Sequence, residues 1–150
     1  MLVFLDIDGV MVPAKGWKTP ELLEDGFPVF TQESTTALKS LLSSETRVIL
    51  STSHRYRYSV TQWKQIFEKR GLRITRLGRL ASAATPSKRK DEIQGWFNSH
   101  PIPKEFIILD DDKSLHSLPE SLKNHWVETP SLVGLTTKNL KEAISQLALS

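Results

Sequence analysis

The sequence contains no cysteine. Disulfide bonds, thiolate metal sites and cysteine nucleophiles are therefore excluded. Glycine and proline are scarce as well, with seven and eight residues, so the composition is not that of a low-complexity chain. No apolar stretch approaches the length of about 20 residues that a membrane-spanning helix needs. The apolar start of the chain meets Asp6 without a basic region or a cleavage site, so we expect no signal peptide and a cytoplasmic protein.

The size and composition are those of an ordinary globular protein. The chain has 150 residues, of which 39% are hydrophobic and 25% are charged. A single hydrophobic core serves chains of about 100–200 residues. We therefore expect one folded domain over residues 1–150.

Positive charge is concentrated in one segment. Residues 55–90 hold eleven basic residues and one acidic residue, a net charge of +10, which leaves −7 for the rest of the chain. This asymmetry favours contact with a polyanion such as a nucleic acid. The alternative is a solvated helix face whose lysines and arginines point outward.

Short apolar runs alternate with stretches of helical periodicity. The runs predict five strands, at 2–6, 47–51, 72–77, 105–110 and 124–128. Apolar residues at helical spacing predict helices at 31–43, 59–70, 87–97 and 137–147. This alternation predicts an α/β fold, a doubly wound (Rossmann-like) parallel five-stranded sheet with helices on both faces. The stretch 9–30 is expected to form a loop or a small hairpin flap beside the first strand.

Acidic residues stand where two of these strands end. The first strand leads to Asp6 and Asp8, and the fourth leads to Asp110, Asp111 and Asp112. Ligands of such sheets bind outside the carboxyl ends of the strands, so these carboxylates are expected to converge. Converging carboxylates raise one another's pKa, and a divalent cation removes that cost. A set of oxygen ligands without cysteine or a histidine pattern favours Mg²⁺.

The neighbouring residues suit phosphoryl transfer. Metal, lysine and hydroxyl donors together stabilise the oxygens of a phosphoryl group in the transition state. A carboxylate can be the nucleophile, and a second carboxylate two residues later can serve as general acid and base. Gly9 after the acid pair allows the backbone to turn tightly.

Four motifs in sequence order carry a resemblance. They are F-L-D-I-D-G-V at 4–10, V-I-L-S at 48–51, the lysines within 88–90, and I-I-L-D-D at 107–111. This set resembles the haloacid dehalogenase (HAD) superfamily of phosphatases over nearly the whole chain. The late acidic group follows the lysines, which excludes the motif order of a response-regulator receiver domain.

The resemblance implies roles for individual residues. Asp6 would be the nucleophile and a magnesium ligand, and Asp8 the general acid/base, which also offers its backbone carbonyl to the metal. Ser51 would bind a phosphoryl oxygen. The family's lysine corresponds to Lys88 or Lys90, between which the sequence does not decide.

The resemblance also implies the remaining ligands. Asp110 would be the late metal ligand, with Asp111 beside it as a ligand or as support for one, while Asp112 is expected to fix a loop. The candidates for binding substrate are Gly9, Thr52, Arg55 and Arg89, and for Arg55 a loop-fixing role is the alternative.

The spaces between the motifs are too short for a separately folded cap domain, because 9–50 and 52–87 must each already supply a helix. We therefore expect no cap domain. The segments S-T-S-H-R at 51–55, K-D-E-I-Q-G-W-F at 90–97 and F-I-I-L-D-D-D at 106–112 are similar to small HAD domains associated with RNA repair.

These observations predict a Mg²⁺-dependent phosphohydrolase that works through an aspartyl-phosphate. Its expected substrate is a terminal phosphate of a nucleic acid, RNA or DNA, and the residues do not decide between a 3′ and a 5′ phosphate. Two alternatives stay open at this point, a small-molecule phosphatase such as a nucleotidase, and a catalytically weak module that binds phosphate or RNA.

Overall fold

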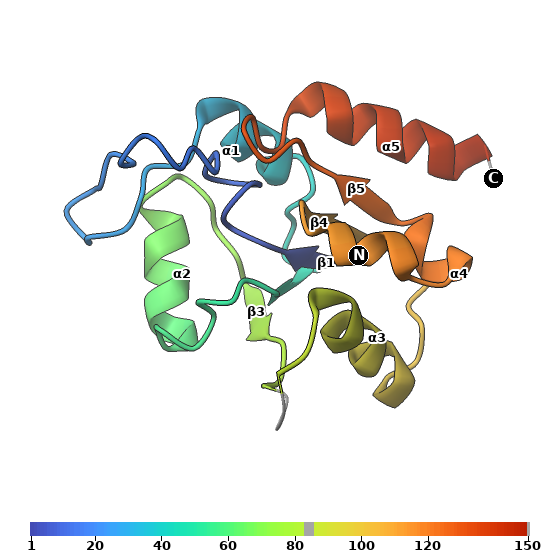
Figure 1. Cartoon of the computed structure of the whole chain (residues 1–150). Coiled ribbons are helices and arrows are strands. Elements are labelled where there is room, and N and C mark those ends of the chain that lie inside the picture. Colours follow the sequence, from blue (N-terminus) through green and yellow to red (C-terminus); the bar gives the residue numbers. More distant parts are fainter. Residues whose placement is uncertain (83–85, 150) are drawn as a thin grey trace.

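The computed structural model describes residues 1–82 and 86–149. Five parallel strands form one sheet in the order β3-β2-β1-β4-β5, which lies at the centre of the molecule in Figure 1. The strands are β1 (Leu2–Leu5), β2 (Arg47–Leu50), β3 (Arg76–Arg79), β4 (Phe106–Asp110) and β5 (Trp126–Glu128). The predicted doubly wound sheet is therefore confirmed.

The helices fall where strand–helix alternation predicts them, with two short additions. The helices are α1 (Gln32–Lys39), α2 (Val60–Glu68), α3 (Arg89–Ser99), α4 (Glu120–Lys123) and α5 (Thr137–Leu149). A 3₁₀ helix, η1 (Lys113–Ser117), precedes α4, and the sequence predicted neither of these two elements. The Thr31 hydroxyl accepts a hydrogen bond from the Ser34 amide at 3.1 Å and caps α1, as expected.

The third strand begins later than predicted. Arg76 is its first residue and pairs with Arg47, the first residue of β2. Because β2 begins at Arg47, residues before Arg76 have no β2 residue to pair with. Leu72 and Ile74 are apolar for another reason, because both are buried in the core from the connection between α2 and β3.

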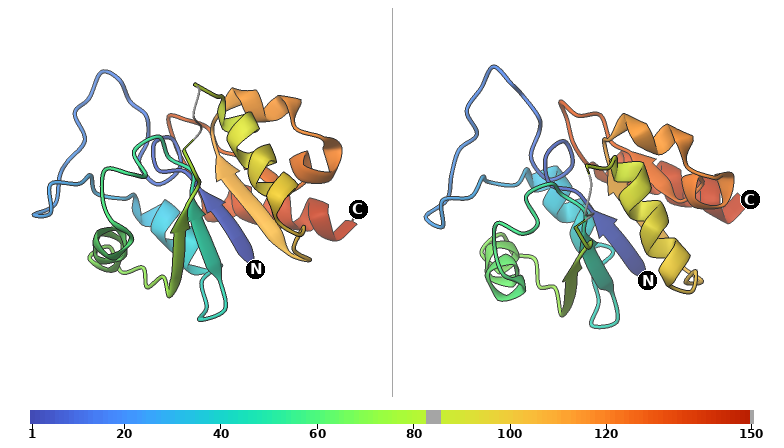
Figure 2. Two further views of the ribbon diagram at one scale, coloured as in Figure 1. Left: turned by 90° about the horizontal axis from the view of Figure 1, so that it is seen from below. Right: turned by 60° about the horizontal axis from the view of Figure 1, so that its bottom comes forward.

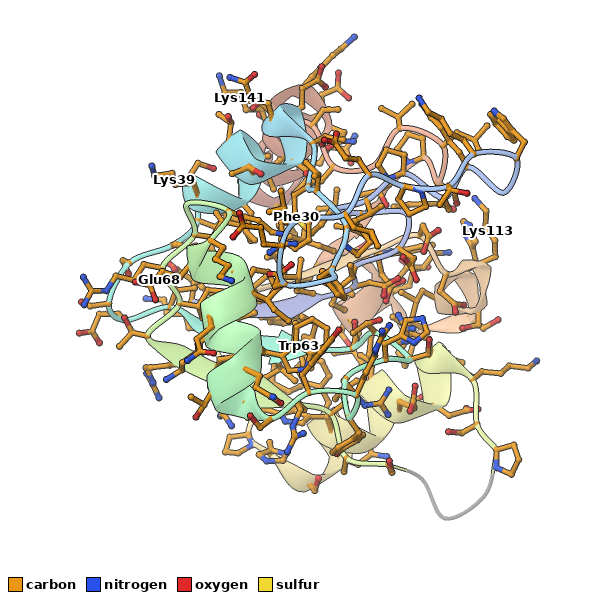
Figure 3. The ribbon with its side chains drawn as sticks, turned by 90° about the vertical axis from the view of Figure 1, so that its left-hand side faces the viewer. Phe30, Lys39, Trp63, Glu68, Lys113 and Lys141 are labelled. Atoms are coloured by element: carbon orange, nitrogen blue, oxygen red, sulfur yellow. The ribbon has the colours of Figure 1, made fainter. Side chains whose placement is uncertain are left out.

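Helices cover both faces of the sheet (Figures 1 and 2). Successive strand residues point to opposite faces, so Val3 and Leu5 join one cluster of buried residues, while Leu2 and Phe4 join the other. The first cluster includes side chains of α1, α2 and α5, and the second includes side chains of α3, η1 and α4. In Figure 3, Trp63 of α2 lies between its helix and the sheet.

The segment between β1 and α1 contains a small hairpin, one of the two predicted alternatives, and it stands out from the body in Figure 2. Leu22 and Pro28 form an antiparallel bridge there. The buried Arg70 guanidinium, at the end of α2, binds the Asp25 carboxylate and the Phe27 carbonyl oxygen and so fastens the hairpin. Trp17, on the same segment, is exposed rather than packed.

No separately folded cap lies over the carboxyl ends of the strands in the described ranges. Between β1 and β2 the chain forms this hairpin and α1, and between β2 and α3 its described residues form α2 and β3. No helix in the described part of the chain has the length and apolar character that crossing a membrane requires.

Candidate active site

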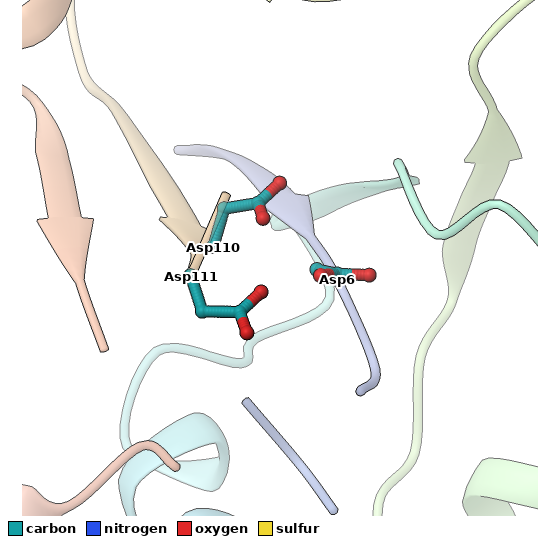
Figure 4. Close-up of side chains that lie close together, drawn as sticks. All are labelled: Asp6, Asp110 and Asp111. Carbon is teal, nitrogen blue, oxygen red and sulfur yellow. The ribbon is translucent and has the colours of Figure 1, made fainter. Parts of the chain in front are cut away.

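Three carboxylates meet between the central strands. Asp6 follows β1, Asp110 ends β4, and Asp111 comes next. One oxygen of each lies within 4.8 Å of the others, and Figure 4 shows the three side chains together at the ends of these strands. The chain leaves β1 toward β2 and leaves β4 toward β5, so this is the point where the strand order reverses and ligands bind. The three acids lie close together because β1 and β4 are adjacent parallel strands that end at the same edge of the sheet.

Burial disfavours the ionised form of the carboxylates in this acid cluster. Asp6 is 5% exposed and Asp110 is fully buried. Burial and the charge of Asp110 raise the pKa of Asp6 to about 8, against the opposing effect of Arg89. Burial also raises the pKa of Asp110. A cation would relieve both effects, and three clustered carboxylates fit an oxygen-preferring ion such as Mg²⁺.

Each carboxylate is oriented by a hydrogen bond from the backbone or a hydroxyl. The Ile7 amide donates to Asp6 Oδ1 at 2.9 Å, and the Asp112 amide donates to Asp110 Oδ1 at 3.0 Å. The Ser131 hydroxyl donates to Asp111 Oδ2 at 2.8 Å. The other oxygens, Oδ2 of Asp6 and Oδ2 of Asp110, contact a cationic side chain, Arg89.

Gly9 makes room for the third acid. Its φ is +81°, and a Cβ placed there would lie 2.0 Å from Asp111 Oδ2. The Thr129 hydroxyl donates to the Gly9 carbonyl oxygen at 2.7 Å and holds this turn. Asp112 caps η1 through the Ser114 amide at 2.9 Å, which is the expected loop-fixing role.

An arginine contacts the acid cluster where the sequence analysis expected a lysine. Arg89 Nη1 lies 2.5 Å from Asp110 Oδ2 and 3.4 Å from Asp6 Oδ2. Burial alone would lower the pKa of Arg89, but the charges of Asp110 and Asp6 outweigh it and raise the pKa. Lys88 is exposed before the start of α3, and Lys90 is half-buried in its first turn. The cation that reaches Asp6 within the described residues is thus Arg89.

The hydroxyl at the end of β2 lies beside the cluster. Ser51 Oγ donates to Asp110 Oδ2 at 3.4 Å, and both residues are buried. Asp8 is the exposed acid of the set, and its Oδ2 lies 3.5 Å from His54 Nε2. Thr52 is buried and accepts a hydrogen bond from the His54 amide. The structure therefore brings Ser51 to the cluster, whereas Asp8 is exposed and is not one of the three clustered acids.

The Arg55 guanidinium, a candidate for binding substrate, is occupied by contacts within the protein. Its guanidinium donates to the carbonyl oxygens of Leu80, Thr52 and Ala81 and forms a very short ion pair with Glu92. These contacts correspond to the loop-fixing alternative for Arg55.

Sequence reasoning did not identify Glu92. Its Oε1 lies 3.7 Å from Arg89 Nε, three residues earlier on α3. The available signal was this spacing of acid and arginine, because residues three apart on a helix are neighbours.

The parallel sheet with helices on both faces, and the acids at the point where its strand order reverses, are those of a HAD-like α/β domain. The comparison with protein families agrees, matching residues 2–140 to the HAD domain in Swiss Army Knife RNA repair proteins. The chain belongs to this family, and the match spans all the strands and every site residue described above. Searches of curated proteins and of solved structures found no match.

Proposed function

We propose that the chain is a Mg²⁺-dependent phosphatase that removes a terminal phosphate from a nucleic acid through an aspartyl-phosphate on Asp6. The observation that carries this proposal is the convergence of Asp6, Asp110 and Asp111 at the sheet's reversal point, with Arg89 in contact. Membership of a HAD family from RNA repair proteins supports both the chemistry and the class of substrate.

Asp6, Asp110 and Asp111 would hold the metal, with the backbone carbonyl of Asp8 as the expected fourth protein ligand. Bound Mg²⁺ would neutralise the carboxylates and the charge that builds up on the phosphoryl oxygens. This matters for Asp6, since a nucleophilic carboxylate must be ionised and burial opposes ionisation.

The protein's own groups account for the two chemical steps. An Asp6 carboxylate oxygen bonds to phosphorus while the bond to the leaving oxygen breaks, and Asp8 gives that oxygen its proton. Asp8 then takes a proton from water, whose oxygen bonds to phosphorus and breaks the bond to Asp6. The products are the free hydroxyl end and inorganic phosphate. The exposed position of Asp8 suits this role because it must meet both leaving group and water.

Arg89 is the cation we assign to the transferred phosphoryl group, with Ser51 as a hydroxyl donor. A guanidinium can hold two oxygens of one phosphate, which a lysine ammonium cannot do in the same planar geometry. Lys88 and Lys90, at the start of α3, are proposed to attract the substrate's remaining charge.

A stacking surface lies on the loop that follows β2. Tyr56 is 49% exposed as a residue, and the guanidinium groups of Arg79 and Arg55 lie 4.6 Å and 5.5 Å from the centroid of its ring. The Tyr56 hydroxyl donates to the Leu80 carbonyl oxygen at 2.6 Å, which fixes the ring. Exposed aromatic rings beside arginines bind single-stranded bases by stacking. This surface supports a nucleic-acid end over a free small molecule as the substrate.

The substrate class is tested by comparing kcat/KM for a short oligonucleotide that carries a 3′ phosphate, its 5′-phosphorylated counterpart, and the matching mononucleotides. We expect one oligonucleotide to exceed its mononucleotide by about 5- to 150-fold, since stacking of one base contributes about 1–3 kcal/mol. Equal or greater values for the mononucleotides would identify a small-molecule phosphatase. Binding without turnover of any of them would identify a binding module.

A further inference from the structure

A line of three buried charged side chains runs from the loop after β2 to the acid cluster. Arg55, Glu92 and Arg89 have side-chain exposures of 6%, 14% and 10%. Glu92 lies in the middle, with Oε2 in a very short contact with Arg55 Nη2 and Oε1 3.7 Å from Arg89 Nε. Arg89 then reaches Asp6 and Asp110 with Nη1.

Burying three charged side chains destabilises the fold unless their contacts with one another replace the hydration that they lose. Ions withdrawn from water lose their hydration, and their mutual attraction offsets this loss only where the contacts are well placed. A surface ion pair that served solubility would not need this burial. The contacts therefore hold these side chains in defined positions at the expense of their hydration. Arg89 is the side chain at the end of the line that reaches the acid cluster.

Arg55 connects Glu92 to the sheet. Its Nε donates to the Leu80 carbonyl oxygen at 2.8 Å, its Nη1 to the Thr52 carbonyl oxygen at 3.1 Å, and its Nη2 to the Ala81 carbonyl oxygen at 3.2 Å. These acceptors lie within two residues of the carboxyl ends of β2 and β3. Glu92 is thus held relative to the strand ends, and not only relative to its own helix.

We propose that Glu92, held by Arg55, is the positioning residue that sets Arg89 for phosphate. Glu92 binds the Nε edge of the guanidinium and leaves Nη1 directed at Asp6 and Asp110, where a phosphate monoester would be attacked. The arginine is then oriented before substrate arrives, so binding does not have to order a long side chain. This inference rests on the proposed phosphatase function and adds two residues to it.

The test starts with Glu92→Gln, which keeps the shape of the side chain and removes its charge. We expect weaker binding of inorganic phosphate by calorimetry and a kcat/KM for p-nitrophenyl phosphate about tenfold or more below the wild type. A misplacement of about 1 Å at a reacting group can cost on the order of 100-fold in rate. Arg55→Lys should act in the same direction, because an ammonium cannot span the three carbonyl oxygens and Glu92 together.

The matched control is Glu33→Gln. Glu33 also lies in the first turn of a helix, on α1, and is exposed. This variant should keep the phosphate affinity and the rate of the wild type. Circular dichroism and thermal melts of all variants show whether the fold is retained.

The deciding experiment combines Glu92→Gln with Arg89→Met. If Glu92 acts through Arg89, it has nothing to position once the guanidinium is gone, so the double variant should bind phosphate as Arg89→Met alone does. Additive losses in phosphate affinity would overturn the proposal, and so would an unchanged affinity in Glu92→Gln. A wild-type protein that binds phosphate and releases none from any substrate would refute the phosphatase function, while the affinities would still judge the role of Glu92.

Discussion

Gly9 and Asp111 share a space that admits one side chain. A Cβ at Gly9 would lie 2.0 Å from Asp111 Oδ2, and the φ of +81° at Gly9 is unfavourable for any other residue. Gly9→Ala should therefore displace the Asp111 carboxylate and weaken Mg²⁺ binding, which calorimetry measures. Gly16→Ala is the matched control, because a Cβ at Gly16 has nothing within 4 Å. Equal Mg²⁺ affinity in both variants would mean that Asp111 is not a ligand.

Asp6 is predicted to reduce stability in the metal-free protein. It is buried beside Asp110, and both burial and the charge of Asp110 disfavour its ionised form. Asp6→Asn should therefore abolish phosphate release and raise the melting temperature in EDTA. About 1 kcal/mol corresponds to roughly 2–4 °C in a protein of this size. A lower melting temperature in EDTA would show that the ion pair with Arg89 outweighs the repulsion.

The acids of the site were predictable from the sequence, whereas the cation beside Asp6 was expected to be Lys88 or Lys90, with Arg89 only a candidate for binding substrate. Asp6, Asp110 and Asp111 follow directly from apolar strands of a parallel sheet, so topology alone brings them together. The choice among Lys88, Arg89 and Lys90 depends on where α3 begins and how it is rotated. Adjacent helix residues point about 100° apart, so a shift of one position exchanges the side chain that faces the site.

At the scale of elements, one ion pair fastens the hairpin before α1. The buried Arg70 guanidinium binds Asp25, and its hydrogen bond holds the pKa of Asp25 below the ordinary value. Asp25→Asn should lower the free energy of unfolding by about 1–3 kcal/mol at pH 7. Urea denaturation measures this difference, and Glu24→Gln, an exposed neighbour, is the control.

The same pair gives a pH dependence with a defined sign. Because the folded pKa of Asp25 is lowered, its stabilisation is complete above the unfolded pKa of about 4 and is lost as the pH falls through the folded value. The difference in stability between the wild type and Asp25→Asn should therefore shrink below about pH 4. A difference that persisted at pH 2 would assign the effect to packing of the hairpin instead.

The long elements were predictable because their patterns repeat, and the short ones were not. η1 and α4 span five and four residues, which is too short for a helical period to stand out. The 3₁₀ helix begins at the Asp112 cap, and the sequence predicted the loop-fixing role of that residue but not the helix that it caps. The start of β3 was misplaced because Leu72 and Ile74 have the apolar character of a strand while they pack as a connection.

At the scale of the molecule, the basic residues of segment 55–90 that the structure describes do not all face the active site. Arg55, Arg70 and Arg89 are paired internally with acids. Arg76 lies at the amino end of β3 and Arg79 at its carboxyl end, so only part of the charge lies on the side of the active site. The net charge of a segment therefore overstates the charge that a substrate meets.

The surface around Tyr56 gives a prediction for the whole complex with nucleic acid. Tyr56→Leu should lower kcat/KM for a phosphorylated oligonucleotide by about 5- to 150-fold, the loss of about 1–3 kcal/mol of base stacking. Tyr56→Phe, which keeps the ring, should retain most of it. Hydrolysis of p-nitrophenyl phosphate should be the same in both variants. A parallel loss with the small substrate would assign Tyr56 to the fold of the loop.

Electrostatic contact with the strand should also appear as a salt effect. If the cations at the start of α3 and at the end of β3 bind phosphates, oligonucleotide affinity should fall steeply as the salt concentration rises. Fluorescence anisotropy of a labelled oligonucleotide measures this slope. An affinity that does not change with salt would remove the nucleic-acid backbone as the partner of these residues.

The most direct test of the account is phosphate release from a phosphorylated oligonucleotide, measured with Mg²⁺, with EDTA and with Asp6→Asn. Asp8→Asn completes the set, and it should be slower by about 10²–10⁴-fold, the usual contribution of general acid–base catalysis. We predict release that requires both the metal and Asp6. Release that continues in EDTA, or at an undiminished rate in Asp6→Asn, would contradict the assignment of Asp6 as the nucleophile of a magnesium-dependent phosphatase.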